Sequence, residues 1–203
     1  MKKVKVCGLT SAEDARYVSE AGADYAGFIL FFPKSKRFVE LEKARDIMAC
    51  LDRQIVPVGV MVKPSAEQVR AACNAGFGAL QLHGDVSDEI IACSSLPVFK
   101  AFNVSDLSDF ERYSTNPKVC GYVFDALVPG SGRTFDWDTL RDIPYDGKIR
   151  LIAGGLGPDN VAEAITATGA DGADTSSGVE NDSGKGKNRE KVLAFVRNVR
   201  ALG

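Results

Sequence analysis

The 203-residue sequence predicts an α/β fold, a single-domain (β/α)8 barrel of the phosphate-binding TIM-barrel type that covers residues 1–203. Apolar runs of strand length alternate with amphipathic segments of helix length, and this pair occurs eight times along the chain. The apolar runs are nearly continuous, as expected for parallel strands that are covered on both faces. Eight units of about 25 residues fit the lower size limit of such barrels, roughly 200 residues. An open doubly wound sheet is the alternative that this pattern leaves.

The strands are predicted from short runs of Val, Ile, Leu, Phe and Ala. Several of these runs follow a glycine of the kind that ends a helix in the left-handed conformation, namely Gly22, Gly76 and Gly169. No linker rich in Ser, Gly or Pro divides the chain, so we expect one domain. In chain order, the predicted strands are residues 4–7, 26–31, 55–62, 79–82, 98–102, 119–124, 149–153 and 170–175.

The helices are predicted from helical spacing of apolar residues and from residues that favour a helix start. Thr10 and Ser11 offer a cap for the first helix, Pro64 and Ser65 open another, and Ser105 offers a cap for a third. Pro158 suits the first position of a helix. In chain order, the predicted helices are residues 12–21, 40–51, 65–75, 87–93, 105–112, 137–141, 158–167 and 188–202.

Composition and charge exclude several classes of protein. Lys plus Arg is 25 and Asp plus Glu is 27, and this near balance argues against a nucleic-acid partner. No apolar stretch approaches the ~18 residues that a membrane span needs, and the N-terminal apolar run is too short for a signal peptide. Five cysteines without CxxC spacing indicate neither a disulfide framework nor a zinc finger. We therefore expect a cytoplasmic protein with no membrane partner.

The active site of such a barrel lies where the strands end. The loops that follow the last two predicted strands are rich in Gly and small hydroxyl residues, as in barrels that bind phosphate through backbone N–H groups. The polar residues and glycines at the strand ends are Cys7, Lys34, Lys36, Arg37, His83, Asp125, Gly154, Gly155, Asp174, Ser176, Ser177 and Gly178.

Cys7 differs from the other cysteines because it ends a strand and precedes Gly8, which would let a substrate approach the backbone. A thiolate at this place would be a nucleophile or a general base, and a buried packing residue is the alternative. Packing is the interpretation for the other four cysteines, which are Cys50, Cys73, Cys93 and Cys120.

Three further side chains at the strand ends suit acid–base chemistry or anion binding. Asp125 follows an apolar strand, so a raised pKa would make it a general acid, and a cap or an ion pair is the alternative. His83 would orient a substrate or donate to a neighbouring carbonyl. Arg37 suits a planar carboxylate, whereas Lys34 and Lys36 are expected to be solvated.

Seven short motifs occur in order along the whole chain. They lie at residues 5–10, 27–28 with 35–39, 58–60, 80–84, 125 with 132–137, 151–161, and 174–180. In this order they resemble the phosphoribosylanthranilate isomerase family of tryptophan biosynthesis.

The resemblance implies a (β/α)8 fold and an Amadori rearrangement that needs no cofactor and no metal. The substrate would be the small molecule N-(5'-phosphoribosyl)anthranilate, and the product 1-(2-carboxyphenylamino)-1-deoxyribulose 5-phosphate. This is the third step of tryptophan formation from chorismate, and the protein would be a monomer or a homodimer. By matching motif, Cys7 would be the general base, Asp125 the general acid and Arg37 the holder of the anthranilate carboxylate. The residues expected to bind the substrate, most of them in phosphate-binding motifs, are His83, Gly154, Gly155, Asp174, Ser176 and Ser177.

The chain also departs from the family pattern. Lys36 stands where the family usually has proline, which predicts a less rigid loop, and the loop at 128–132 and Thr175 differ too. Two other interpretations of the function remain. Another phosphosugar barrel would be an epimerase, which needs several histidines, or the histidine-pathway Amadori isomerase, which has an aspartate in place of Cys7. A non-catalytic phosphosugar-binding barrel would need neither Cys7 nor Asp125.

Overall fold

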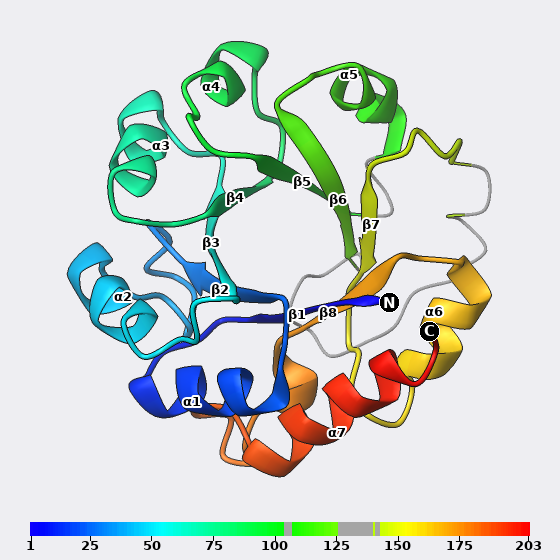
Figure 1. Ribbon diagram of the computed structural model, residues 1–203. Helices are drawn as coiled ribbons and strands as arrows, with labels where there is room; N and C mark the ends of the chain where they lie inside the picture. The colour runs from blue at the N-terminus through cyan, green and yellow to red at the C-terminus, as the bar shows by residue number, and fades with distance from the viewer. Residues whose placement is uncertain (104–106, 126–139, 141–142) are drawn as a thin grey trace.

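The computed structural model describes residues 1–103, 107–125, 140 and 143–203. Eight parallel strands form a closed barrel in the order β1 to β8, with β1 hydrogen-bonded to β8 (Figure 1). This architecture confirms the predicted fold class and rules out the open doubly wound sheet. The strands are β1 Lys3–Cys7, β2 Tyr25–Ile29, β3 Val56–Val62, β4 Ala79–His83, β5 Val98–Asn103, β6 Val119–Asp125, β7 Ile149–Ile152 and β8 Gly172–Thr175.

Helices surround the barrel on its outside, and α1 and α7 lie side by side (Figure 1). The α-helices of the described residues are α1 Ala12–Ala21, α2 Leu41–Met48, α3 Ala66–Cys73, α4 Asp88–Ala92, α5 Phe110–Ser114, α6 Val161–Thr168 and α7 Arg189–Arg200. Short 3-10 helices occur at η1 Leu107–Asp109 and η3 Ser177–Val179. Ser11 and Ser65 each form a capping box, which explains why α1 and α3 begin where the sequence predicts.

The apolar core has two layers because alternate residues of each strand face opposite sides. Val4 and Val6 of β1 face outward and belong to the cluster between strands and helices. Cys7 belongs to the smaller cluster inside the barrel, with Val60, Phe99 and other strand residues. The side chain of Lys5 is fully buried and shares the inward face with Cys7. The barrel interior therefore contains charge as well as hydrocarbon.

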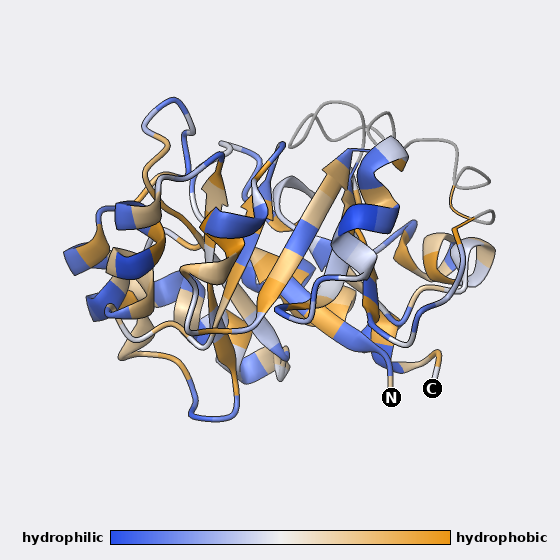
Figure 2. Ribbon diagram, turned by 90° about the horizontal axis from the view of Figure 1, so that it is seen from above, coloured by the Kyte–Doolittle hydropathy of each residue, from blue (hydrophilic) through white to orange (hydrophobic). Residues whose placement is uncertain are grey.

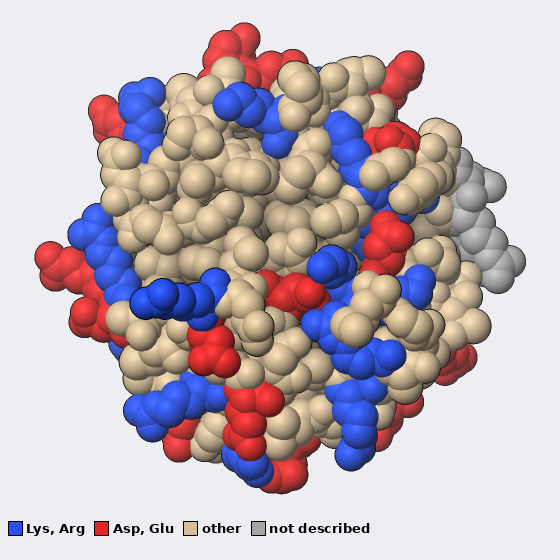
Figure 3. Space-filling view, viewed as in Figure 1, with Lys and Arg blue, Asp and Glu red and all other residues tan. Residues whose placement is uncertain are grey.

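Both chain termini lie at the lower edge of the barrel in Figure 2, where β1 begins. The strands run from this edge toward the opposite one, and their C-terminal ends meet there. Figure 3 shows the face at the N-terminal ends, on which basic and acidic side chains are mixed. Within the described part of the chain, no helix is long and apolar enough to cross a bilayer.

The helix predicted to start at Pro158 begins later than expected, at Val161. The reason is local. The Asn160 side chain accepts the N–H of Gly157 at 2.8 Å and donates to the carbonyl of Gly155 at 3.1 Å, which folds the preceding residues into a turn. The predicted cap Ser105, the predicted helix at 137–141 except Leu140, and the loop at 128–132 lie outside the described residues.

The contact between β8 and β1 closes the barrel at a glycine. A Cβ atom on Gly172 would overlap the carbonyl oxygen of Lys3, its backbone partner on β1. We therefore expect Gly172→Ala to reduce the free energy of unfolding by roughly 3 kcal/mol, measured by urea titration, because the backbone must move to relieve the overlap. Gly59→Ala is the control, since its Cβ would meet only side-chain ends, Leu30 Cδ1 at 3.1 Å and Leu80 Cδ2 at 3.2 Å. Equal losses in the two variants would contradict this prediction.

Candidate active site

A cavity of about 820 Å³ opens at the C-terminal ends of the strands. Its walls come from most of the loops that follow the strands, which are far apart in the sequence. The nine candidate catalytic and substrate-binding residues all line this one cavity. They are Cys7, Arg37, His83, Asp125, Gly154, Gly155, Asp174, Ser176 and Ser177.

Cys7 lies beside a buried ion pair. Lys5 Nζ is 2.9 Å from Asp174 Oδ2, and both side chains are almost completely shielded from solvent. Lys5 also hydrogen-bonds the Cys7 side chain. The strand register explains the group, because Lys5 pairs with Asp174 across β1 and β8 and Cys7 lies two residues further along β1.

Gly27 on β2 makes room for this group. A Cβ atom at Gly27 would lie 2.7 Å from Cys7 Sγ and 3.1 Å from Lys5 Nζ. Any side chain there would push the thiol or the ammonium group from its place. Gly27 thus permits the contact between Cys7 and Lys5.

Burial and charge act in opposite directions on the thiol. Burial raises the pKa of Cys7, the Lys5 ammonium group lowers it and the Asp174 carboxylate raises it, and the net pKa is above its ordinary value. Burial likewise raises the pKa of Asp174 against the influence of Lys5. Burial disfavours the charge on Lys5, but Asp174 and Cys7 outweigh it, so the Lys5 pKa is raised. The protonated, positively charged form of Lys5 is therefore favoured beside the thiol.

The loops after β7 and β8 contact each other through their backbones. Gly154 and Gly155 have φ of +90° and +65°, which only glycine adopts without strain. The Thr175 hydroxyl donates to the carbonyl of Leu156 at 2.6 Å, and a Cβ atom on Gly178 would overlap the same carbonyl. Ser176 Oγ donates to the carbonyl of Cys7 at 2.9 Å, which ties the loop to β1.

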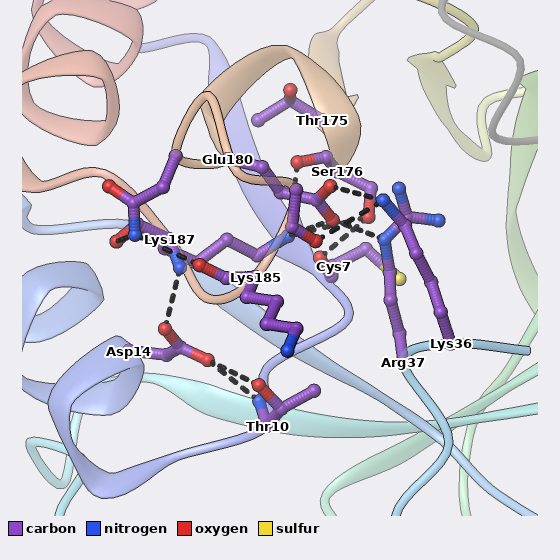
Figure 4. Close-up of polar contacts among 12 residues, drawn as sticks. Cys7, Thr10, Asp14, Lys36, Arg37, Thr175, Ser176, Glu180, Lys185 and Lys187 are labelled. Atoms are coloured by element: carbon purple, nitrogen blue, oxygen red, sulfur yellow. Dashed lines mark hydrogen bonds and ion pairs between the residues drawn. The ribbon is translucent and has the colours of Figure 1, made fainter.

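Arg37 lies at the edge of the cavity and is held by Glu180 (Figure 4). Arg37 Nε donates to Glu180 Oε1, and Lys36 Nζ lies 2.9 Å from Glu180 Oε2. Arg37 Nη2 is buried and has no hydrogen-bond partner among the described residues. Lys36 is expected from the sequence to be solvated. Its side chain is about half exposed, but it forms an ion pair with Glu180.

His83 is neutral in this site. Burial lowers its pKa to about 3, and the charges of Lys100 and Lys5 contribute in the same direction. Its Nε2 lies 2.8 Å from Gln81 Nε2, so the amide donates and the ring nitrogen accepts. Either role considered for His83, orienting a substrate or donating to a carbonyl, would have to use the other ring nitrogen.

Sequence reasoning missed three charged residues of this region, Lys5, Glu180 and Lys187. Lys5 had a usable signal, because the residue two positions before Cys7 on a strand shares its face. Glu180 ends the motif at residues 174–180, but nothing in the sequence pairs it with Arg37. Lys187 had no signal, since only the closed barrel brings it to Ser176 and Glu180. The packing interpretation is wrong for Cys50, which is exposed after α2, while all five cysteines are free thiols.

Comparison with known proteins identifies one family along the chain. A family model described as N-(5'phosphoribosyl)anthranilate (PRA) isomerase matches residues 4–198. An N-(5'-phosphoribosyl)anthranilate isomerase of Geotalea uraniireducens (strain Rf4) is 41% identical over 207 residues, covering 100% of each chain.

Solved structures agree with this match. A crystal structure of phosphoribosyl anthranilate isomerase from Thermotoga maritima has a TM-score of 0.87 and 35% identity, covering 99% of this chain and 100% of the other. Another such isomerase, crystallised with reduced 1-(o-carboxyphenylamino)-1-deoxyribulose 5-phosphate, has a TM-score of 0.85 and 33% identity over the same shares. A third structure, of monomers generated from the dimeric Thermotoga maritima isomerase, has a TM-score of 0.86 and 33% identity over the same shares.

The three-residue group at Cys7 yields two predictions of opposite sign. We expect Lys5→Met to raise the pKa of the Cys7 thiol, because the stabilising cation is lost, and Asp174→Asn to lower it, because the opposing anion is lost. The pH dependence of alkylation by iodoacetamide measures this pKa, and Cys7→Ser gives the background from the other four cysteines.

Lys3→Met is the matched control on the same strand, since the Lys3 side chain is 44% exposed and pairs with Asp24. Its alkylation profile should coincide with that of the parent protein. Shifts of the same sign in Lys5→Met and Asp174→Asn would show that a general loosening of the site, rather than charge, controls the thiol.

Proposed function

Because the chain belongs to the N-(5'-phosphoribosyl)anthranilate isomerase family, we propose that Cys7 and Asp125 are the general base and the general acid of its active site. The chain is an isomerase of tryptophan biosynthesis that catalyses the Amadori rearrangement of N-(5'-phosphoribosyl)anthranilate to 1-(2-carboxyphenylamino)-1-deoxyribulose 5-phosphate. One observation carries the proposal: Cys7 and Asp125 line the same cavity from β1 and β6. The two groups can therefore act on one bound sugar from different sides.

The reaction begins with opening of the ribose ring. Asp125 donates its proton to the ring oxygen, the bond from this oxygen to C1' breaks, and the nitrogen lone pair forms a double bond to C1'. The product of this step is a protonated Schiff base. Its positive charge acidifies the hydrogen on C2'.

The second step removes that hydrogen. Cys7, once its thiol has lost its proton to solvent, takes the C2' proton, and the electron pair left behind forms a double bond between C1' and C2' while the nitrogen becomes neutral. The resulting enolamine becomes the ketone when the proton of the C2' hydroxyl is lost and C1' gains one. The thiol and the carboxylate then return to their initial states by exchange with solvent.

Binding groups surround these two residues. Arg37, whose Nη2 is buried at the cavity edge, is proposed to hold the anthranilate carboxylate. The loops at Gly154–Gly155 and at Ser176–Ser177 are proposed to receive the phosphate through backbone N–H groups and hydroxyls, which positions the sugar by remote binding energy.

Asp174 forms an ion pair with Lys5, and a carboxylate in this place would repel a phosphate, although Asp174 lies in the motif that the resemblance connects with phosphate. Its Oδ1 is buried in the cavity wall with no partner among the described residues. We propose that this oxygen accepts a hydrogen bond from a sugar hydroxyl while Oδ2 holds Lys5. Neutral His83 is proposed to contact the substrate without taking part in proton transfer.

The remaining expectations stay proposals. A small-molecule phosphoribosyl substrate is proposed for the cavity, and a monomer or a homodimer is proposed for the assembly. A cytoplasmic location rests on the five free thiols. The single domain over residues 1–203 is supported by the pairing of β1 with β8 across the whole length of the chain.

Loss of either proposed acid–base residue should abolish most turnover. We expect Cys7→Ala and Asp125→Asn each to lower kcat by roughly 10²- to 10⁴-fold, the usual contribution of such groups, with an unchanged urea midpoint. Neither variant should complement a bacterial tryptophan auxotroph that lacks this step.

Cys120→Ala is the matched control, because Cys120 packs against the inner cluster near the start of β6, away from the cavity. It should keep normal turnover and complement the auxotroph. Near-normal kcat in Cys7→Ala or Asp125→Asn would contradict the mechanism. Failure of the parent protein to complement despite good expression would favour a binding protein.

A further inference from the structure

We propose that Glu180 is a positioning residue that aims the Arg37 guanidinium at the carboxylate of the substrate, and that Lys36 holds Glu180 in place from the solvent side. The inference rests on the proposed function, in which Arg37 binds that carboxylate. It adds two residues, from loops at opposite ends of the chain, to the recognition of the aromatic part of the substrate.

The nitrogen atoms of the Arg37 guanidinium group have different environments. Arg37 Nε donates to Glu180 Oε1, whereas Nη2 is buried, lacks a partner among the described residues and belongs to a side chain that lines the cavity. A carboxylate that binds Nε fixes the plane of the group. The buried Nη2 is then left to donate to a ligand in the cavity.

The stem of Arg37 is restricted as well. Gly8 has φ of +76°, and a Cβ atom there would lie 2.5 Å from Arg37 Cδ and 3.3 Å from Arg37 Cβ. The arginine stem therefore rests directly on the backbone of Gly8. With Glu180 at the other end, the side chain has little rotational freedom left to lose when a substrate binds.

Glu180 is itself held by three cations (Figure 4). Besides Arg37, Lys36 Nζ lies 2.9 Å from Oε2, and Lys187 Nζ lies 3.6 Å from Oε1. Burial raises the pKa of Glu180, but the hydrogen bonds from Arg37 and Lys36 and the nearby cations outweigh it, so the net pKa is lowered. Lys187 is also influenced by Asp14, and burial lowers its pKa to about 8. The three cations still outnumber the two carboxylates, and the positive charge that remains near Arg37 favours an acidic group of a substrate.

Lys36 is the exposed member of this cluster. Its side chain is 57% exposed, so its ion pair with Glu180 is of the kind that contributes little and is screened by salt. Lys36 Nζ also lies 3.3 Å from the carbonyl of Gly184, which links the loop after β2 to the loop after β8. Lys36, the position at which the sequence predicts a less rigid loop, is thus held by its contacts with Glu180 and Gly184.

The test compares two substrates that differ only in the group that Arg37 is proposed to bind. N-(5'-phosphoribosyl)anthranilate has the carboxylate, and N-(5'-phosphoribosyl)aniline lacks it. We expect Glu180→Ala to raise KM for the first about 10- to 100-fold, the value of a hydrogen bond to a charged group, with little change in kcat. KM for the aniline compound should change less than about threefold. Glu180→Gln, which keeps an acceptor for Arg37 Nε, should restore most of the loss.

Arg37→Ala and the double variant Arg37→Ala/Glu180→Ala complete a cycle. Once Arg37 is absent, removal of Glu180 should cost nothing further with either substrate. Equal losses on both substrates, or additive losses in the double variant, would make Glu180 a structural residue and overturn the inference while Arg37 keeps its role. Failure of Arg37→Ala to distinguish the substrates would overturn the role of Arg37 and this inference together. Urea midpoints check folding, and Glu180→Gln keeps the test valid if Glu180→Ala is unstable.

The role of Lys36 is tested by comparing two variants of the same loop, Lys36→Met and Lys34→Met. Lys36→Met should raise KM for N-(5'-phosphoribosyl)anthranilate up to about fivefold at low salt, and its ratio to the parent value should approach one at high salt. Lys34→Met, on the same loop but exposed and outside the cavity wall, should give a ratio of one throughout. A ratio of one for Lys36→Met at low salt would overturn the part assigned to Lys36.

Discussion

The buried ion pair between Lys5 and Asp174 connects the two strands that close the barrel and lies beside the proposed base. Taking two charges out of water costs several kcal/mol per ion, so such a pair adds little to stability. Its placement is better explained by reactivity. Burial raises the pKa of Cys7 and Lys5 opposes this rise, although the net pKa stays above its ordinary value. Closure of the fold and the state of the thiol therefore depend on the same contact.

Most of the fold follows from local pattern, because strand-length apolar runs and the caps Ser11 and Ser65 act on their immediate neighbours. The start of α6 does not follow, since the Asn160 side chain closes a turn where Pro158 suggested a helix. Candidate residues at strand ends could be predicted because a barrel brings all such ends together. The partner of Arg37 could not, since Glu180 lies 143 residues away and only the closed ring brings it near.

Net charge describes this molecule poorly. A formal charge of −2 argues correctly against a generally basic surface, yet the cavity edge gathers Arg37, Lys36 and Lys187 around one carboxylate. Inside the barrel, Lys5 similarly faces one carboxylate and one thiol. Lys5 in the barrel interior and Arg37 in the cavity wall each have an acidic partner, Asp174 and Glu180 respectively. A nearly neutral chain thus contains two separate cationic sites, one beside the Cys7 thiol and one proposed to bind the substrate carboxylate.

Gly27 shows that a residue without a functional group can control the chemistry of its neighbours. Its single hydrogen leaves the volume in which the thiol of Cys7 and the ammonium group of Lys5 meet. If this glycine were replaced during the divergence of such a barrel, the thiol would be displaced from Lys5 and the base would lose its function. No acid, base or ligand-binding side chain would have changed. A comparison of relatives that considers only the polar residues of the site would then find all of them present and would not explain the loss of activity.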